Sequence, residues 1–358
     1  MSASPFDHPF LSGLLGDADI SAHFSAEADI AAMVRFEIAL ARAQAVEGVI
    51  GAEAADAIER GLSDFQLDMA TLRDGVARDG VVIPALVKAM RQAIGAPHGE
   101  NVHFGATSQD AIDTSLALRL VDVLAVLEER LRGVVAALRS LEAAQGGIEV
   151  MAHTRMQAAI PVTAARKIAS WRLPLERHIE RLEAVCRDVL VLSLAGAAGT
   201  LEKLGDKGPA VRARLAEALG LADVDHPRHS ERDGQGALAN WLSLVSGSLG
   251  KMGQDIALMA QNEVGEVKLA AGGGSSAMPH KQNPVGAEVL VTLARFNATL
   301  VAGMHQSLVH ENERSGAGWT LEWMLLPQMA VATGAGLRHA GMLLDGLRVQ
   351  PPSRSSLT

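Results

Sequence analysis

The chemically richest stretch of this chain is 272–283, which reads Gly-Gly-Gly-Ser-Ser-Ala-Met-Pro-His-Lys-Gln-Asn. Three glycines allow a bent or mobile backbone, while the hydroxyls, the amide and two possible cations stay polar. A Gly/Ser run is more often a flexible linker without chemistry. Here Asn283 as N-cap and Pro284 at the first helical position predict a helix start, so the run is tied to a helix. We therefore interpret it as a loop that covers a catalytic site.

A second polar cluster, Asn-Val-His-Phe-Gly-Ala-Thr-Ser-Gln-Asp at 101–110, stands directly before a long segment with helical apolar periodicity. Thr107 and Asp110 have the spacing of a capping box, in which each side chain binds a backbone N–H at the helix start. Capping alone is a sufficient reason for that spacing. Free backbone N–H groups at a helix start also bind carboxylates. The cluster is therefore compatible with a simple cap or with a cap that is also an anion site.

Two more polar clusters flank later helices. His153, Arg155 and Gln157 alternate through a segment that we predict to be extended, so their side chains would point the same way. A lone histidine or glutamine near a helix start is more often a hydrogen-bonded structural group. The run His-Glu-Asn-Glu-Arg-Ser-Gly-Ala-Gly-Trp at 310–319 contains Arg314, and such charge runs are more often solvated helix ends. Both clusters are candidate substrate contacts with a structural alternative.

Composition excludes several classes of protein. Apolar residues make up 48% of the 358 residues, aromatic residues only 3%, and tyrosine is absent, which favours closely packed helices over sheets. The formal charge of -9 argues against a nucleic-acid partner, so an anionic substrate would need a local cationic pocket. The single cysteine, Cys186, excludes an internal disulfide and fits the reducing cytoplasm. No uncharged apolar run reaches the length of a membrane span, so we expect a soluble protein without a membrane partner.

Apolar periodicity predicts an all-α protein built as an elongated bundle of long helices. The first hundred residues are expected to form shorter helices, including 27–49 and 68–94. Long helices are expected at 110–145, at 161–194 with a kink at Pro174, at 234–270, at 283–314 and from 321 onward. We expect a smaller helical N-terminal domain at 1–104, a central bundle at 105–350 and a tail at 351–358. Such long helices carry more apolar surface than a monomer covers, which predicts an oligomer.

Together these segments resemble the fumarase/aspartase superfamily over almost the whole chain. The stretch Gly-Ser-Ser-Ala-Met-Pro-His-Lys-Gln-Asn-Pro at 274–284 matches the superfamily signature and is highly specific. Within the superfamily, the chain is most similar to the 3-carboxy-cis,cis-muconate cycloisomerases, through 102–114, 157–163, the Glu-Arg pair at 313–314, and 316–323. The resemblance implies a homotetramer whose active sites are each assembled from three subunits. It also implies a small polycarboxylate substrate and no metal or organic cofactor.

The resemblance further implies a reaction and a set of site residues. One substrate carboxylate adds to a C=C bond through an aci-carboxylate intermediate, which gives a carboxymuconolactone in aromatic-acid catabolism. Ser275 would transfer the proton, while Lys281 and Asn283 would hold the carboxylate on which charge grows. Further substrate contacts are expected from His103, Thr107, Ser108, Arg155, Gln157, Ser276, Met278 and Arg314.

Two departures from the family pattern bear on function. Lyases of the superfamily carry a histidine at the position of Arg155, and an arginine cannot give up its proton at neutral pH. A lactonisation needs no such acid, since its nucleophile is an ionised, tethered carboxylate. His153 could take over the role, so a lyase of the adenylosuccinate or argininosuccinate type stays an alternative. Family members also continue into a further small helical domain, which we expect to be largely absent here. A catalytically silent structural homologue is the other alternative, and the intact Ser275, Lys281 and Asn283 speak against it.

Overall fold

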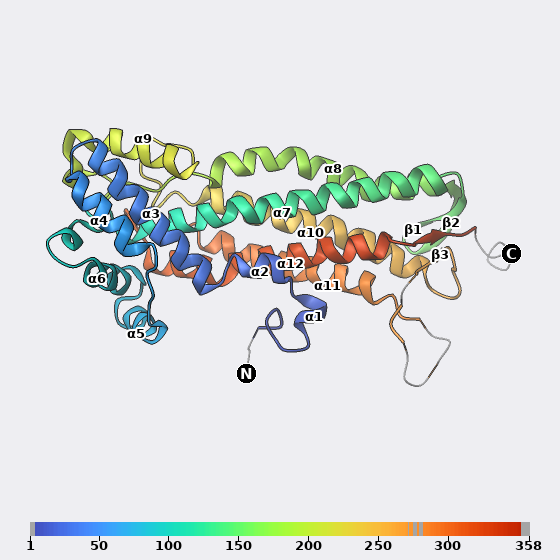
Figure 1. Cartoon of the computed structure of the whole chain (residues 1–358). Helices are drawn as coiled ribbons and strands as arrows, with labels where there is room; N and C mark the ends of the chain where they lie inside the picture. Colours follow the sequence, from blue (N-terminus) through green and yellow to red (C-terminus); the bar gives the residue numbers. More distant parts are fainter. Residues whose placement is uncertain (1–3, 271, 275–277, 279–281, 352–358) are drawn as a thin grey trace.

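The computed structural model describes residues 4–270, 272–274, 278 and 282–351, and it forms an elongated bundle of long helices (Figure 1). Within these ranges, strands are confined to two short two-stranded sheets. The predicted all-α class is confirmed. The long helices are α7 (Ser108–Gln145), α8 (Ala164–Val189), α10 (Asp233–Met259), α11 (Val285–Gln306) and α12 (Gly316–Leu344).

Apolar side chains at helical spacing build the core of the bundle. Leu127 and Leu131 of α7 are fully buried, and their spacing of four places them on one face of the helix. Trp171 of α8 and Trp241 of α10 are the largest side chains that are fully buried in the same core. The 38 residues of α7 span about 57 Å at 1.5 Å per residue. Groups at the two ends of the bundle are therefore far apart.

A second core lies at one end of the bundle and combines N-terminal helices with a later segment. Its N-terminal elements are α3 (Ala26–Val46), α4 (Ala52–Leu62), α5 (Met69–Asp79), α6 (Ile83–Ile94) and the 3-10 helix η1 (His98–Asn101). The preceding helices α1 (Ser12–Leu15) and α2 (Ala18–Ala22) pack against α11 and α12 of the main bundle instead. The later segment contributes η2 (Glu202–Lys207) and α9 (Gly208–Leu219), which packs against α3. This core takes in side chains of 32–118 and of 192–221. The division into 1–104, 105–350 and 351–358 stays a prediction.

Several predicted helices were too long, among them the following three. The helix expected at 68–94 is two helices, because Gly80 ends α5 in the left-handed conformation at φ 74°. The helix expected at 234–270 ends at Met259. The chain then turns, and β3 (Val267–Lys268) pairs with β4 (Arg348–Val349). The helix expected at 283–314 ends at Gln306, and α12 begins at Gly316.

A β-hairpin stands at the other end of the bundle, between α7 and α8. Its strands β1 (Glu149–Thr154) and β2 (Gln157–Thr163) are antiparallel, and Arg155 and Met156 form the turn with φ of 48° and 67°. Two successive positive φ values give the tight reversal that joins hairpin strands. The prediction that His153, Arg155 and Gln157 share one extended segment was therefore wrong, since Arg155 lies in the turn.

Helix α11 is unusually apolar for a helix at the surface. In the described part of the chain, it alone is long and apolar enough to cross a membrane by length and composition. It packs between α10 and α12 in the bundle, yet only 28% of its most apolar window is buried. Phe296 and Leu300 are partly buried against the core, whereas exposed side chains such as Thr292, Ala298 and Ala302 leave one face of α11 uncovered in the single chain.

Candidate active site

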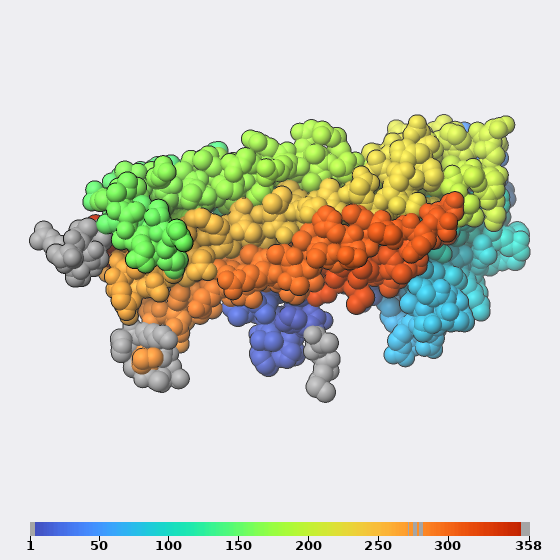
Figure 2. Space-filling model, turned by 180° about the vertical axis from the view of Figure 1, so that it is seen from behind, coloured from blue at the N-terminus to red at the C-terminus, as the bar shows by residue number. Residues whose placement is uncertain are grey.

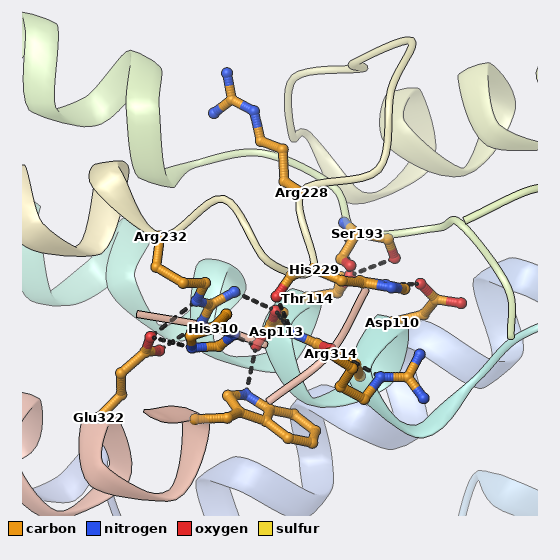
Figure 3. A network of polar contacts seen from close by, with 12 residues as sticks. Asp110, Asp113, Thr114, Ser193, Arg228, His229, Arg232, His310, Arg314 and Glu322 are labelled. Carbon is orange, nitrogen blue, oxygen red and sulfur yellow. Dashed lines mark hydrogen bonds and ion pairs between the residues drawn. The ribbon is translucent and has the colours of Figure 1, made fainter. Parts of the chain in front are cut away.

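The start of α7 is built around a buried carboxylate. The N-cap residue Thr107 and Asp110 form the predicted capping box, with the Thr107 N–H donating to Asp110 Oδ2 at 2.9 Å. Asp110 is fully buried and also accepts from the backbone N–H groups of Ala195 and Gly196 at 2.9 and 3.0 Å. His229 Nε2 lies 2.8 Å from Asp110 Oδ1. The carboxylate thus fixes the segment at 195–196 to the helix start. Figure 3 shows its contact with His229.

Arg314 lies beside the same helix start. Its Nε donates to Gln109 Oε1 at 3.0 Å, and its Nη2 donates to the carbonyl of Ala197 at 3.3 Å. Thr107 and Ser108 are half-buried at the first positions of the helix. The structure therefore brings together three of the predicted substrate contacts from segments about two hundred residues apart. A helix N-terminus and a guanidinium are both suited to binding a carboxylate.

A buried ion-pair network supports this end of the molecule (Figure 3). The Arg232 guanidinium binds the Asp113 carboxylate at 2.6 Å and the Glu322 carboxylate at 2.5 Å, and all three side chains are buried or nearly so. Burial lowers the pKa of Arg232, but Asp113 and Glu322 outweigh that effect and raise its pKa. Gln109 Nε2 donates to Asp113 Oδ2 at 3.1 Å, which connects the network to the amide that holds Arg314.

The predicted contact His103 also lies at this end, in the segment before α7. Its Nδ1 is 2.5 Å from Glu37 Oε1 on α3, and its backbone φ is 62°. Burial lowers the pKa of His103, but the charge and hydrogen bond of Glu37, with the charge of Asp110, raise it overall. The imidazole is therefore biased toward its cationic form.

The hairpin residues lie at the opposite end of the bundle. His153, Arg155 and Gln157 are all exposed, and His153 Nδ1 lies 3.2 Å from the carbonyl of Met151. His153 also lines a cavity of about 370 Å³, together with the cations Arg166, Lys167 and Lys251 and the buried Glu266. Two of these cations are paired with carboxylates of the same cavity, Lys167 with Glu266 and Lys251 with Asp255.

The described residues on either side of the signature segment stand at this end too. Ser275, Ser276 and Lys281 lie outside the described residues. Met278 is 42% exposed. Gly273 and Asn283 exchange two backbone hydrogen bonds of 2.9 Å, which bring the two ends of the signature segment together. The predicted N-cap was displaced by one residue, because Asn283 makes this bridge and Pro284 occupies the N-cap position of α11.

The predicted site residues therefore form two groups within one chain. Thr107, Ser108, His103 and Arg314 lie at the α7 start, which we call the network end. The hairpin and the start of α11, which Asn283 precedes, lie at the other end of the bundle, which we call the hairpin end (Figure 1).

Several residues of this arrangement were missed by the sequence reasoning. Four side chains bind one another across the fold: Gln109, Asp113, Arg232 and Glu322. Arg232 lies 119 positions from Asp113 and 90 from Glu322, and only Gln109 and Asp113 belong to the same helix. The run Gly-Ala-Ala-Gly-Thr at 196–200 was also passed over. Its small residues, with Gly196 and Gly199 in the left-handed region, are a signal that could have marked it as a tight segment near a site.

Comparison with known proteins places the chain in a family. The lyase family model matches residues 17–298. A 3-carboxy-cis,cis-muconate cycloisomerase of Pseudomonas aeruginosa is 40% identical over 93% of this chain and 74% of its own length. Two crystal structures are also similar. The 3-carboxy-cis,cis-muconate lactonizing enzyme of Pseudomonas putida has a TM-score of 0.90 at 36% identity, covering 96% of this chain and 78% of that one. A fumarate lyase of Mesorhizobium sp. BNC1 has a TM-score of 0.88 at 35% identity, covering 94% and 77%.

The chain therefore belongs to the lyase family, within the fumarase/aspartase superfamily. Its relatives at 35–40% identity include four that are named 3-carboxy-cis,cis-muconate cycloisomerase, and these define the branch that it resembles in detail.

Proposed function

We propose that this chain is a cycloisomerase that converts 3-carboxy-cis,cis-muconate to a carboxymuconolactone in aromatic-acid catabolism. The observation that carries the proposal is the 40% identity to a cycloisomerase of that name across 93% of the chain. The signature segment and the helix start at Thr107 supply residues suited to the chemistry. The reaction is internal to the substrate, so the chain's own residues need only bind the carboxylates and move one proton.

The bond changes balance, because the electrons stay within the substrate and the enzyme supplies one proton. A substrate carboxylate oxygen bonds to one carbon of a C=C, and the electron pair of that double bond moves toward the neighbouring carboxylate, forming the aci-carboxylate. The adjacent carbon then takes a proton from Ser275, which later recovers one from solvent. Lys281 and Asn283 stabilise the charge that develops, and preorganised donors of this kind contribute roughly 3 to 4 kcal/mol each.

The other carboxylates need separate contacts, since a chain with a net charge of -9 repels a trianion in general. The α7 start with Thr107 and Ser108 receives one, and Arg314, held by Gln109, binds another through its guanidinium. Gln157 orients the substrate from the hairpin. His153, Arg155, Ser276 and Met278 are the further substrate contacts of this group.

The separation of the two groups favours active sites that are shared between subunits. Helix α7 is about 57 Å long, so one substrate cannot touch both of its ends in the same chain. Antiparallel packing of copies would bring the hairpin end of one chain to the network end of another. The face formed by α10, α11 and α12 in Figure 2 is suited to this packing, because α11 exposes small side chains such as Thr292, Ala298 and Ala302. We infer a cytoplasmic homotetramer with each site built from three subunits.

A lyase of the superfamily is the competing activity. Its leaving group needs a proton donor, and Arg155 cannot serve at neutral pH. His153 is exposed beside the hairpin, so it is the residue that would have to supply the proton.

The deciding experiment is the ultraviolet absorbance of 3-carboxy-cis,cis-muconate in the presence of the purified protein. Lactonisation removes the conjugated diene, so absorbance should fall with the parent and not with Ser275→Ala. A Ser63→Ala variant, on an exposed site of the N-terminal region, is the matched control and should keep parental activity. If the parent leaves the absorbance unchanged, the cycloisomerase assignment fails. Adenylosuccinate and argininosuccinate are then the next substrates, with His153→Ala as the informative variant.

A further inference from the structure

A buried carboxylate at the network end has a partner on one oxygen only. Glu37 of α3 is 2% exposed, and its Oε1 lies 2.5 Å from His103 Nδ1. Its Oε2 is buried and has no hydrogen-bond partner among the described residues. Burying a carboxylate with an unsatisfied oxygen destabilises a protein, so such a group calls for a functional explanation.

The backbone at His103 is held in a strained conformation from two sides. Its φ of 62° is uncommon for a residue with a side chain, and such strain persists only where the surroundings enforce it. Gln44 Nε2 donates to the carbonyl of Phe104 at 2.6 Å, and Arg91 Nη2 donates to the carbonyl of Val102 at 2.9 Å. The carbonyls on either side of His103 are thus fixed by side chains of α3 and α6. These contacts direct the imidazole toward Glu37.

A cavity of about 630 Å³ lies beside His103. Its lining includes His103, Ser108 at the α7 start, and the cations Lys88 and Arg91 of α6. Because Nδ1 is taken by Glu37, Nε2 is the ring nitrogen left for a ligand. A cation-lined cavity that opens onto a helix N-terminus is suited to a carboxylate.

The charges around the ring come from four elements. Glu37 of α3 and Asp110 of α7 favour the imidazolium, and Arg91 of α6 disfavours it. Lys88 of α6 and Glu100 of η1 also line the cavity, with opposite signs. Among the described residues, Glu37 makes the hydrogen bond to the ring and contributes the largest favourable charge.

We propose that Glu37 is a positioning residue that keeps His103 as an imidazolium facing this cavity, where His103 and Lys88 bind the substrate carboxylate received at Ser108. The inference rests on the proposed function for its ligand. The geometry does not depend on that function, because the cavity and the pair of Glu37 and His103 lie within one chain. Glu37 touches no substrate atom; it acts by fixing the charge and orientation of His103.

The test is the isosteric variant Glu37→Gln, which keeps a hydrogen-bonding side chain and removes the charge. The pKa of His103 should fall, so the imidazolium is lost at a lower pH than in the parent. At a pH about one unit above the shifted pKa, KM for the tricarboxylate should rise about tenfold, with kcat less affected. Activity should recover as the pH is lowered, because protonation restores the cation.

Gln44→Met is the matched control, since Gln44 is equally buried on α3 and holds the neighbouring carbonyl without a charge. Its effect should be the same at every pH. The His103 titration, followed by NMR and assigned with His103→Gln, gives a readout that needs no turnover, so it stands even if the proposed reaction fails. A Glu37→Gln profile parallel to the parent's, or an unshifted His103 titration, would overturn the proposal.

Discussion

At the network end, Asp110 accepts hydrogen bonds from three backbone N–H groups and Arg232 binds two carboxylates, all within one chain. At the hairpin end, Arg155 and Gln157 lie exposed, and no hydrogen bond of their side chains is found among the described residues. The first arrangement is complete in the single chain and the second is not. The contrast suggests that the network end is a preformed receptor, whereas the hairpin end acquires its partners from a neighbouring subunit and the substrate.

Removing the central cation of the network should produce the largest effect on stability. In Arg232→Met, Asp113 and Glu322 would stay buried without their partner, and breaking a buried pair costs about 3 to 5 kcal/mol. Urea unfolding at a fixed protein concentration measures this change. Arg132→Ala, which breaks the exposed pair with Glu128, is the control and should cost less than about 1 kcal/mol. Equal losses in the two variants would remove the distinction between the network and an ordinary surface.

A change at the hairpin end should affect activity and leave stability nearly untouched. Gln157→Ala should lower kcat/KM about 100-fold through lost orientation, with unfolding free energy within about 0.5 kcal/mol of the parent.

Arg314→Ala should lower activity from the network end. Refolding the two inactive variants together should restore roughly a quarter of parental activity if each site takes its two ends from different chains at random. An absence of recovery would mean that both ends must belong to one chain.

The structure of the network end could be predicted from the sequence more completely than that of the hairpin end. Apolar periodicity predicted α7 almost to its bounds, and the capping box at Thr107 and Asp110 is present, because both signals are local in sequence. Helix ends set by tertiary contacts were predicted poorly, as at Met259. The hairpin turn at Arg155 lacks the glycine or asparagine that usually marks a positive φ, so the turn could not be predicted from its residues.

The candidate site, too, could be predicted only where its residues are close together in the sequence. The signature segment can be recognised from one short run of residues, and it alone suggested Ser275, Lys281 and Asn283. The pair of Arg232 with Asp113 joins residues 119 positions apart, and Glu37 meets His103 across 66. Such partners are set by how the helices pack, and no local pattern reports them. Predicting the chemistry was therefore easier than predicting what supports it.

The middle of the bundle offers a contrast to both ends, because its buried histidine is neutral. His178 of α8 lies 2.9 Å from Ser248 Oγ, and burial, with the charges of Arg181 and Arg177, lowers its pKa to about 4. Between pH 6.5 and 4, His178 binds a proton in the unfolded chain and not in the folded chain, so stability falls as the pH is lowered. The slope from this group approaches about 1.4 kcal/mol per pH unit.

His178→Gln should flatten that part of the pH dependence relative to the parent, as measured by urea unfolding at several pH values and one protein concentration. His153→Gln is the matched control at the exposed hairpin end and should leave the slope as it is. If the two variants behave alike, burial of His178 does not control its protonation.

The smallest effect compares two helix caps, one at each end. Ser315, the N-cap of α12 at the network end, is buried and its Oγ accepts from the Gly318 N–H at 3.1 Å. Thr163, the N-cap of α8 behind the hairpin, makes no side-chain cap hydrogen bond. Ser315→Ala should therefore cost about 1 kcal/mol of unfolding free energy, and Thr163→Ala less than about 0.5. Urea unfolding resolves the difference. If Thr163→Ala were as costly, the hairpin end would contain a cap that holds it rigid within the single chain, and its reliance on a neighbouring subunit would be weaker than the contrast implies.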